Sequence, residues 1–385
     1  MEHSKKIVYL AGFIFSIPIA MMSYINSSFL STFVDEKFVG MVYLLGSVAA
    51  IAALLIAPVI LRKMGGYKFI ILLILLDSLT ILAFATTKSL AVVVLAFIFG
   101  FALNNTIIFS LDEFLKILSK NSSMGGTRGI YLTLTNLAWI LSQILFIIIG
   151  SEGKFSFRLI YFISFFLMLV FFVLSALALR HIPDPNYDKK RIWKSIKEFI
   201  KNKNLMRAYG MNLLLHVFYA TMVIYTPIYL SAHIGLEWKA IGIIFAIMLL
   251  PFSILPISAG KYSDKIGERR MLMFGFFIIS FSTLSLFLIH SKEIWIWATL
   301  LFITRIGAAM IEVMSDVYFF KHIKAENDEF VGVYRNAIPM SFIVGPLVAS
   351  VTFYFVPAFN FIYLVLGAIM LWGVYLSSTI SKNDI

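Results

Sequence analysis

The segment GKYSDKIGERR (260–270) is a short polar connection between two apolar runs, at about residues 239–259 and 270–290. Gly267 permits a tight turn because glycine adopts positive φ angles without steric cost. Asp264 can accept hydrogen bonds from backbone N–H groups at the start of a neighbouring helix, where the helix dipole also favours an anion. The segment therefore predicts a turn between two membrane-spanning helices that also contacts a third helix.

The rest of the chain is mostly apolar. Of its 385 residues, 61% are hydrophobic and 14% are charged, whereas soluble domains carry roughly 25% charged residues. The mean hydropathy is +0.93. We therefore predict an all-α membrane protein with twelve transmembrane helices and no room for a separate soluble catalytic domain. Each run is near the roughly 20 residues that cross a bilayer, and the runs lie at about 7–30, 38–60, 68–86, 90–113, 126–150, 157–180, 205–230, 239–259, 270–290, 294–320, 329–354 and 357–379.

The positive charges follow the predicted spans. If Met1 is cytoplasmic and the spans alternate in direction, most Lys and Arg residues fall in cytoplasmic connections, which is the bias that sets membrane topology. We therefore expect a multi-pass protein of the cytoplasmic membrane with both termini in the cytoplasm. The net charge of +12 then reflects topology and does not indicate a nucleic-acid partner. The chain contains no cysteine, which excludes disulfides, thiolate metal sites and cysteine nucleophiles.

A polar stretch in the middle of the chain divides the predicted spans into two sets of six. We expect an N-terminal bundle at 1–180, a cytoplasmic linker at 181–204 and a C-terminal bundle at 205–385. Within the linker, RIWKSIKEFIKNK (191–203) favours a basic amphipathic helix on the inner membrane surface over a solvated helix. Its apolar face would consist of Ile192, Trp193, Ile196, Phe199 and Ile200.

The two halves also repeat each other. GIYLTLTNLAWI (129–140) and GVYRNAIPMSFI (332–343) begin alike at the start of the fifth span of each half. KMGGYK (63–68) and KIGERR (265–270) both connect the second span to the third, at almost the same offset. A repeat of six helices is a recurring transporter architecture that places its binding site at the repeat interface.

The segment 260–270 resembles the signature of the major facilitator superfamily: Gly, three residues, Asp, a basic residue, any residue, Gly, any residue and two basic residues. With the repeat and the basic central loop, the resemblance covers the whole chain. It implies two pseudo-symmetric six-helix bundles around a cavity lined by the first, fourth, seventh and tenth helices. It also implies a gating motif of Gly260, Asp264, Lys265, Gly267, Arg269 and Arg270, with Arg128 beside Asp264 at the start of the fifth helix.

The first half departs from the family pattern. LRKMGGYK (61–68) places Arg62 where the signature has its acidic residue, and Pro58 stands at the position of the first glycine. The Gly-Pro pair of antiporters is absent from the fifth span, and Gly345-Pro346 occurs in the eleventh span instead. These differences weaken an antiporter assignment.

Three charges lie in the tenth predicted span, FITRIGAAMIEVMSDVYFF (302–320). At 100° per residue, Arg305, Glu312 and Asp316 share one narrow face of a helix. Intramembrane ionisable residues are expensive and often functional. For Glu312 we favour reversible protonation over a structural ion pair. For Asp316 we favour pairing with Arg269 or Arg270, although Arg335 is an alternative partner of either acid.

Polar residues on other spans complete the candidate site. The candidates for proton coupling are Glu312, Asp316 and Asp77. Isolated Asn and Ser residues often join membrane helices instead of binding a ligand, and a buried partner for Asp77 is as compatible with the sequence as a proton role. The candidates for substrate binding are Arg305, Asn26, Asn104, Asn105, Asn136, Asn212, His216, Tyr219 and Arg335.

These features predict a secondary active transporter of a small solute, coupled to protons through Glu312, with efflux favoured over uptake. The resemblance allows multidrug-like efflux and sugar-like transport. The alternative is a proton-independent facilitator of a sugar or other small polar solute. An integral membrane enzyme is a minor alternative because the His residues form no catalytic or metal-binding cluster. No phosphate loop indicates ATP use. We expect no metal or cofactor, and a monomer whose partners are substrate, protons and the lipid bilayer.

Overall fold

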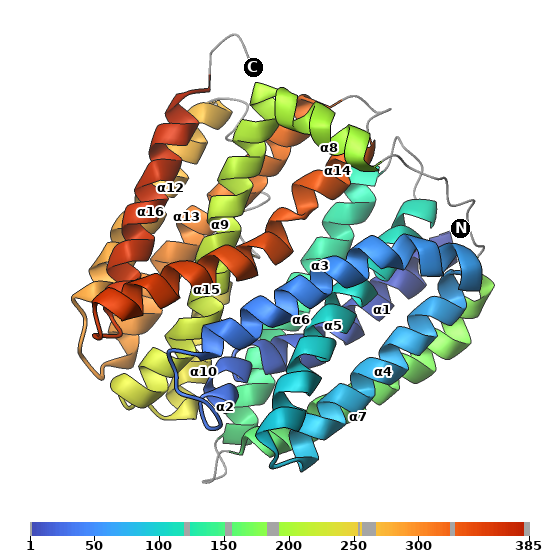
Figure 1. Cartoon of the computed structure of the whole chain (residues 1–385), viewed down its shortest axis with the longest axis horizontal. Coiled ribbons are helices and arrows are strands. Elements are labelled where there is room, and N and C mark those ends of the chain that lie inside the picture. The colour runs from blue at the N-terminus through green and yellow to red at the C-terminus, as the bar shows by residue number, and fades with distance from the viewer. Residues whose placement is uncertain are drawn as a thin grey trace. The chain divides into compact units, whose positions relative to one another are not determined.

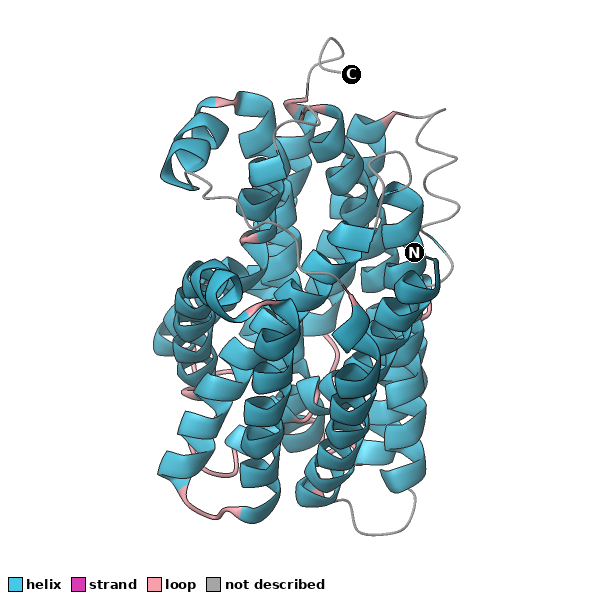
Figure 2. Cartoon of the chain, turned by 90° about the vertical axis from the view of Figure 1, so that its right-hand side faces the viewer, coloured by secondary structure: helices cyan, strands magenta, loops and turns pink. Residues whose placement is uncertain are grey.

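A computed structural model describes residues 2–118, 124–150, 156–182, 192–252, 255, 267–323 and 328–380. Its regular elements are helices, and no strand occurs in the described ranges (Figure 2). Among the described residues, ten helices are long and apolar enough to cross a membrane. Shorter apolar helices, Thr133–Ile149 and Trp238–Leu249, lie at the two remaining predicted spans. The chain is therefore an all-helical, multi-pass membrane protein.

The chain divides into two compact units, Met1–Asp188 and Lys189–Ile385. In the first unit, α1 packs on α6 and α7, α3 packs on α5, and α4 packs on both α5 and α7 (Figure 1). The elements of this unit are α1 (Glu2–Ser23), α2 (Asn26–Leu30), α3 (Val39–Met64), α4 (Gly66–Thr86), α5 (Leu90–Leu118), α6 (Met124–Gly150), α7 (Phe157–Ala178) and η2 (Leu179–His181).

In the second unit, α13 lies against α9, α10 and α12, and α16 packs on α12 and α9. Helix α15 packs on α9, and the short helix α14 contacts α8, α9 and α15 (Figure 1). The elements are α8 (Ile192–Lys201), α9 (Lys203–Ile228), η3 (Tyr229–His233), α10 (Trp238–Leu249), α12 (Glu268–Phe287), α13 (Ile294–Lys321), α14 (Asp328–Arg335), α15 (Ala337–Phe355) and α16 (Phe361–Ser378).

The internal repeat is visible in the backbone of two turns. Gly65 precedes α4 with φ 79° and ψ 156°, and Gly267 precedes α12 with φ 85° and ψ 146°. L-residues with a side chain rarely adopt this conformation. The glycines occupy matching positions of KMGGYK and KIGERR, so both halves have a positive-φ glycine immediately before the helix that follows.

Small residues let helices of the second unit approach closely. Gly275 on α12 faces Gly307 on α13, and a Cβ atom added at Gly307 would lie 2.6 Å from the backbone oxygen of Gly275. Close backbone approach through glycine is a common way of packing helices in lipid, where apolar side chains alone give little driving force. This contact fixes α13, which carries the charged residues, against its neighbour.

The linker helix α8 packs on the second unit. Phe199 is only 1% exposed, and its ring centroid lies 5.7 Å from that of Phe330 and 6.3 Å from that of Phe319. The prediction that this residue faces the membrane surface is therefore wrong, because an aromatic cluster of the protein itself buries it. Ile200, from the same predicted face, remains exposed.

Candidate functional site

Polar side chains from three helices meet in the second unit. Helix α9 contributes Tyr219 and His216. Helix α13 contributes Arg305, Glu312 and Asp316, and the end of α14 contributes Arg335. Glu312 lies within Coulombic range of Arg305, Asp316 and Arg335. The fold therefore gathers seven of the predicted residues, these six and Asn212, in one unit.

Glu312 is hydrogen-bonded across the helix interface. Tyr219 Oη donates to Glu312 Oε2 over 2.9 Å. The carboxyl group is exposed, although its helix lies in a membrane-spanning segment. A tyrosine hydroxyl both donates and accepts, so this contact persists whether the carboxyl group is ionised or protonated.

Arg305 is buried against aromatic rings. The side chain is 2% exposed, and its Cζ atom lies 5.1 Å from the ring centroid of Phe218 and 5.3 Å from that of Tyr219. Such cation–π contacts stabilise a guanidinium group. Its Nε and Nη1 atoms are buried and have no hydrogen-bond partner among the described residues. Sequence reasoning missed Phe218, which a search for an aromatic residue beside Tyr219 would have found.

Asp316 pairs with Arg335. Arg335 Nη2 donates to Asp316 Oδ2 over 3.0 Å, and both side chains are partly exposed. The preferred prediction, a pair with Arg269 or Arg270, is therefore wrong. At the start of α12 it is instead Glu268 that pairs with α13, through Lys321, and this pairing holds the two helix ends together.

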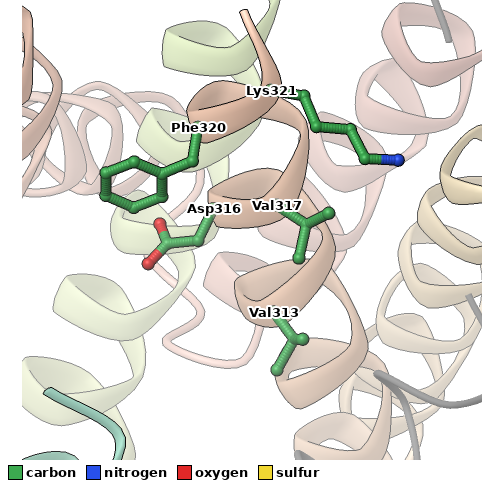
Figure 3. Close-up of a pocket in the computed structure, with 5 residues that line it drawn as sticks. All are labelled: Val313, Asp316, Val317, Phe320 and Lys321. Atoms are coloured by element: carbon green, nitrogen blue, oxygen red, sulfur yellow. The ribbon is translucent and has the colours of Figure 1, made fainter. Parts of the chain in front are cut away.

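A hollow of about 490 Å³ opens beside this pair. It is lined by Val313, Asp316, Val317, Phe320 and Lys321, all from the last turns of α13. Asp316 and Phe320 project to one side of the helix and Lys321 to the other (Figure 3). The lining thus combines an acid, a base and apolar side chains.

Asn212 connects α9 to the end of α14, and His216 packs beside it on α9. Asn212 Nδ2 donates to the backbone oxygen of Tyr334 over 3.3 Å. His216 Nδ1 lies 2.8 Å from the backbone oxygen of Asn212, and the His216 ring stands nearly perpendicular to that of Tyr219, with centroids 5.7 Å apart. The His216 ring thus packs on the tyrosine that donates to Glu312.

A separate polar cluster lies between α4 and α5 in the first unit. Asp77 is fully buried, and its Oδ1 atom accepts hydrogen bonds from Asn104 Nδ2 and Thr80 Oγ1, each over 3.3 Å. Asp77 Oδ2 and Asn104 Oδ1 have no hydrogen-bond partner in the part of the chain that the structure describes. Sequence reasoning missed Thr80, although its place three residues after Asp77 puts both on one helix face.

The other predicted polar residues are dispersed. Asn105 Nδ2 donates to the backbone oxygen of Phe101 in its own helix, and Asn26 Oδ1 accepts a hydrogen bond from Tyr161 Oη over 2.8 Å. Asn136 is half-buried on α6. In the gating motif, Gly260, Asp264 and Lys265 lie outside the described residues, as does the side chain of Arg128.

Comparison with known families and structures covers the whole chain. The family model described as Major Facilitator Superfamily matches residues 7–346 and 227–381. No curated protein sequence matches the chain.

Solved structures share the fold at low sequence identity. The nucleoside transporter NupG has a TM-score of 0.77 and 12% identity, with 97% of this chain and 98% of that chain covered. The POT family transporter PepTSo has a TM-score of 0.80 and 11% identity, with 100% of this chain and 98% of that chain covered. A D-xylose-proton symporter has a TM-score of 0.75 and 13% identity, with 99% of this chain and 98% of that chain covered.

Proposed function

The chain belongs to the major facilitator superfamily, and from that membership we propose that it is a secondary active transporter that moves a small solute by alternating access. The family and the structural neighbours point to membrane transport rather than to an enzyme. The proposed partners are therefore a small solute, protons and the lipid bilayer, and the proposed working form is a monomer.

The proposal couples transport to protons through Glu312. The observation that carries it is the hydrogen bond from Tyr219 to this carboxyl group on a membrane-spanning helix. An intramembrane carboxyl group that lines a pathway is a typical proton relay. Because the tyrosine hydroxyl can donate to the ionised group and accept from the protonated one, Glu312 can change its protonation state without losing its partner.

The other two acids receive structural roles in this proposal. Asp316 is neutralised by Arg335, and Asp77 is hydrogen-bonded between two packed helices of the first unit. The expectation of efflux rests on acidic groups that would attract a cationic solute. Since Asp316 is paired, that attraction is reduced, and we propose symport of solute and proton instead.

The proton test uses the purified protein in liposomes loaded with a pH-sensitive dye. Sugars, nucleosides, carboxylates and organic cations are added to wild type and to Glu312→Gln. The matched control is Glu293→Gln, which changes an exposed acid at the start of the same helix. We expect a solute-dependent proton flux that only Glu312→Gln abolishes. Solute uptake with an unchanged rate in Glu312→Gln would favour the alternative, a proton-independent facilitator of a polar solute.

The distribution of Lys and Arg supports cytoplasmic termini. Because the chain has no cysteine, single introduced cysteines report topology without background. We expect a membrane-impermeant maleimide to label Lys239→Cys in intact cells, and to label Lys5→Cys only after permeabilisation. The reverse pattern would contradict the proposed orientation.

A further inference from the structure

Arg305 is a buried cation whose charge no described side chain neutralises by contact. Two of its guanidinium nitrogens, Nε and Nη1, have no hydrogen-bond partner in the described part of the chain, although the residue is 2% exposed. A buried charge that is neither paired nor hydrogen-bonded costs several kcal/mol at least, on the order of the desolvation penalty of an ion. A chain that keeps such a group in a membrane-spanning helix must gain something from it in another state.

The nearest acids are committed elsewhere. Glu312 lies seven residues further along α13, which separates the two Cα atoms by about 10.5 Å along the helix axis. Its Oε2 atom accepts the hydrogen bond from Tyr219, and Asp316 pairs with Arg335. Arg305 and Glu312 thus influence each other electrostatically without an ion pair between them.

The surroundings of Arg305 suit a planar, bidentate partner. Phe218 and Tyr219 lie against its guanidinium carbon at 5.1 and 5.3 Å, and these rings restrict the side chain from one element, α9. Guanidinium presents its donors in a fixed fork that matches a carboxylate or a phosphate group. A guanidinium group has two such forks, Nε with Nη2 and Nη1 with Nη2, and each of them includes one of the atoms of Arg305 that have no partner among the described residues.

We propose that Arg305 is the subsite for an oxyanion of the transported solute, so that the substrate is a small organic anion carrying a carboxylate or a phosphate group. This inference rests on the proposed transport function and adds its substrate class. The anion accepts hydrogen bonds from one fork of the guanidinium group, either Nε with Nη2 or Nη1 with Nη2, and neutralises the buried charge. The rest of the solute molecule lies beside the rings of Phe218 and Tyr219.

The site also explains why the anion travels with a proton. Tyr219 contacts both Arg305 and Glu312, so an anion on Arg305 lies close enough to repel an ionised Glu312. Bound anion and protonated Glu312 therefore favour each other, and by linkage each raises the affinity for the other equally.

The remaining charged groups near Glu312 are already balanced or distant along their helices. His216 on α9 and Arg335 on α14 face the same region as Asp316, and Arg335 is engaged by that acid. Helices α10 and α12 also pack against α13, and their charged residues lie in the first turn of each helix. These are Lys239 on α10, and Glu268, Arg269 and Arg270 on α12.

The test measures binding of matched anions and neutral analogues to the purified full chain by isothermal titration calorimetry. The pairs are benzoate with benzamide, lactate with lactamide, and glucose 6-phosphate with glucose, and tetraethylammonium is the cationic probe. For at least one pair we expect the anion to bind tenfold or more tightly than its neutral analogue. The carboxylate and phosphate pairs distinguish the two oxyanions.

Variants then assign the preference to Arg305. Arg305→Gln should abolish it, Arg305→Lys should retain part of it, and Arg62→Gln, at an exposed arginine on α3, should leave it unchanged. Arg305→Met removes an unpaired buried charge and should fold, so a loss of anion binding there is not a loss of structure. Titration in buffers of different ionisation enthalpy should show proton uptake with the anion in wild type but not in Glu312→Gln.

Three results would overturn the inference. In wild type, these are equal binding of the anions and their neutral analogues, or no binding of any anion. In Arg305→Gln, it is a preference for the anion that survives. If one of these binding results is obtained and a neutral or cationic solute still drives proton flux in liposomes, the proposed anion subsite is wrong and the proposed transport function stands. If no solute of the liposome panel moves, the transport function itself fails.

Discussion

Tyr219 Oη donates a hydrogen bond to Glu312 Oε2 over 2.9 Å, and the ring of the same tyrosine lies against the guanidinium group of Arg305. One residue of α9 therefore contacts both a candidate proton acceptor and a buried cation of α13. The hydroxyl and the ring can be separated by mutation, so the two contacts can be tested independently.

Tyr219→Phe removes the hydroxyl and keeps the ring. A hydrogen bond to a charged group is worth about 1.5–3 kcal/mol, so we expect solute-driven proton flux to fall roughly tenfold or more while Arg305 keeps its aromatic contact. Proton flux in dye-loaded liposomes measures the effect. Tyr354→Phe, at a highly exposed tyrosine, is the matched control, and an equal loss in both variants would contradict a specific role of Tyr219.

The pair of Asp316 and Arg335 should stabilise the second unit modestly. Both groups are partly exposed, and exposed pairs contribute about 0.2–1 kcal/mol. We expect Asp316→Asn and Arg335→Gln to lower the melting temperature slightly, and the double variant to lower it by less than the sum. Asp316→Asn should retain solute-driven proton flux. Loss of that flux in a folded Asp316→Asn protein would contradict the structural role and would indicate that Asp316 takes part in proton transfer.

Asp77 should tolerate an amide better than an apolar side chain. Asp77→Asn preserves the size of the side chain and can still accept hydrogen bonds from Asn104 and Thr80. In Asp77→Leu, Thr80 Oγ1 still donates to the backbone oxygen of residue 77 and Asn104 Nδ2 to that of Gly100, but the second Nδ2 hydrogen of Asn104 loses its acceptor between the two helices. Each buried polar group left unsatisfied costs about 1–3 kcal/mol. Thermal unfolding of the purified variants should rank wild type and Asp77→Asn above Asp77→Leu. If Asp77→Asn folds normally but loses proton flux, the structural role proposed for Asp77 is wrong.

Gly307→Ala should separate α12 from α13. The added Cβ atom would lie 2.6 Å from the backbone oxygen of Gly275 and 2.9 Å from the backbone nitrogen of Ile279, and overpacking of this kind typically costs about 1–3 kcal/mol. We expect a lower melting temperature in detergent. Gly332→Ala is the control, because a Cβ atom there meets nothing within 4 Å and alanine favours the helix. Equal stability of the two variants would show that the helices adjust freely.

The helices and ten of the twelve predicted membrane spans could be predicted from the sequence because lipid imposes a long apolar run on each span. The gathering of Arg305, Glu312 and Asp316 on one helix face follows from helical geometry alone. The partner of Asp316 could not be predicted, since Arg269, Arg270 and Arg335 all compete for it and the choice depends on where α14 ends. Likewise, the pattern of α8 identifies an apolar face, but only tertiary packing shows that Phe199 is buried by Phe319 and Phe330.

The matching backbone of Gly65 and Gly267 bears on the origin of this protein and on its redesign. Two glycines with the same positive-φ, extended-ψ conformation at equivalent places are most simply explained by duplication and fusion of a six-helix ancestor. A residue with a side chain at either place would cost about 1–3 kcal/mol, whichever solute is transported. A library that diversifies α9 and α13 to change selectivity can therefore hold both turns constant, and the scaffold and its recognition surface can be evolved separately.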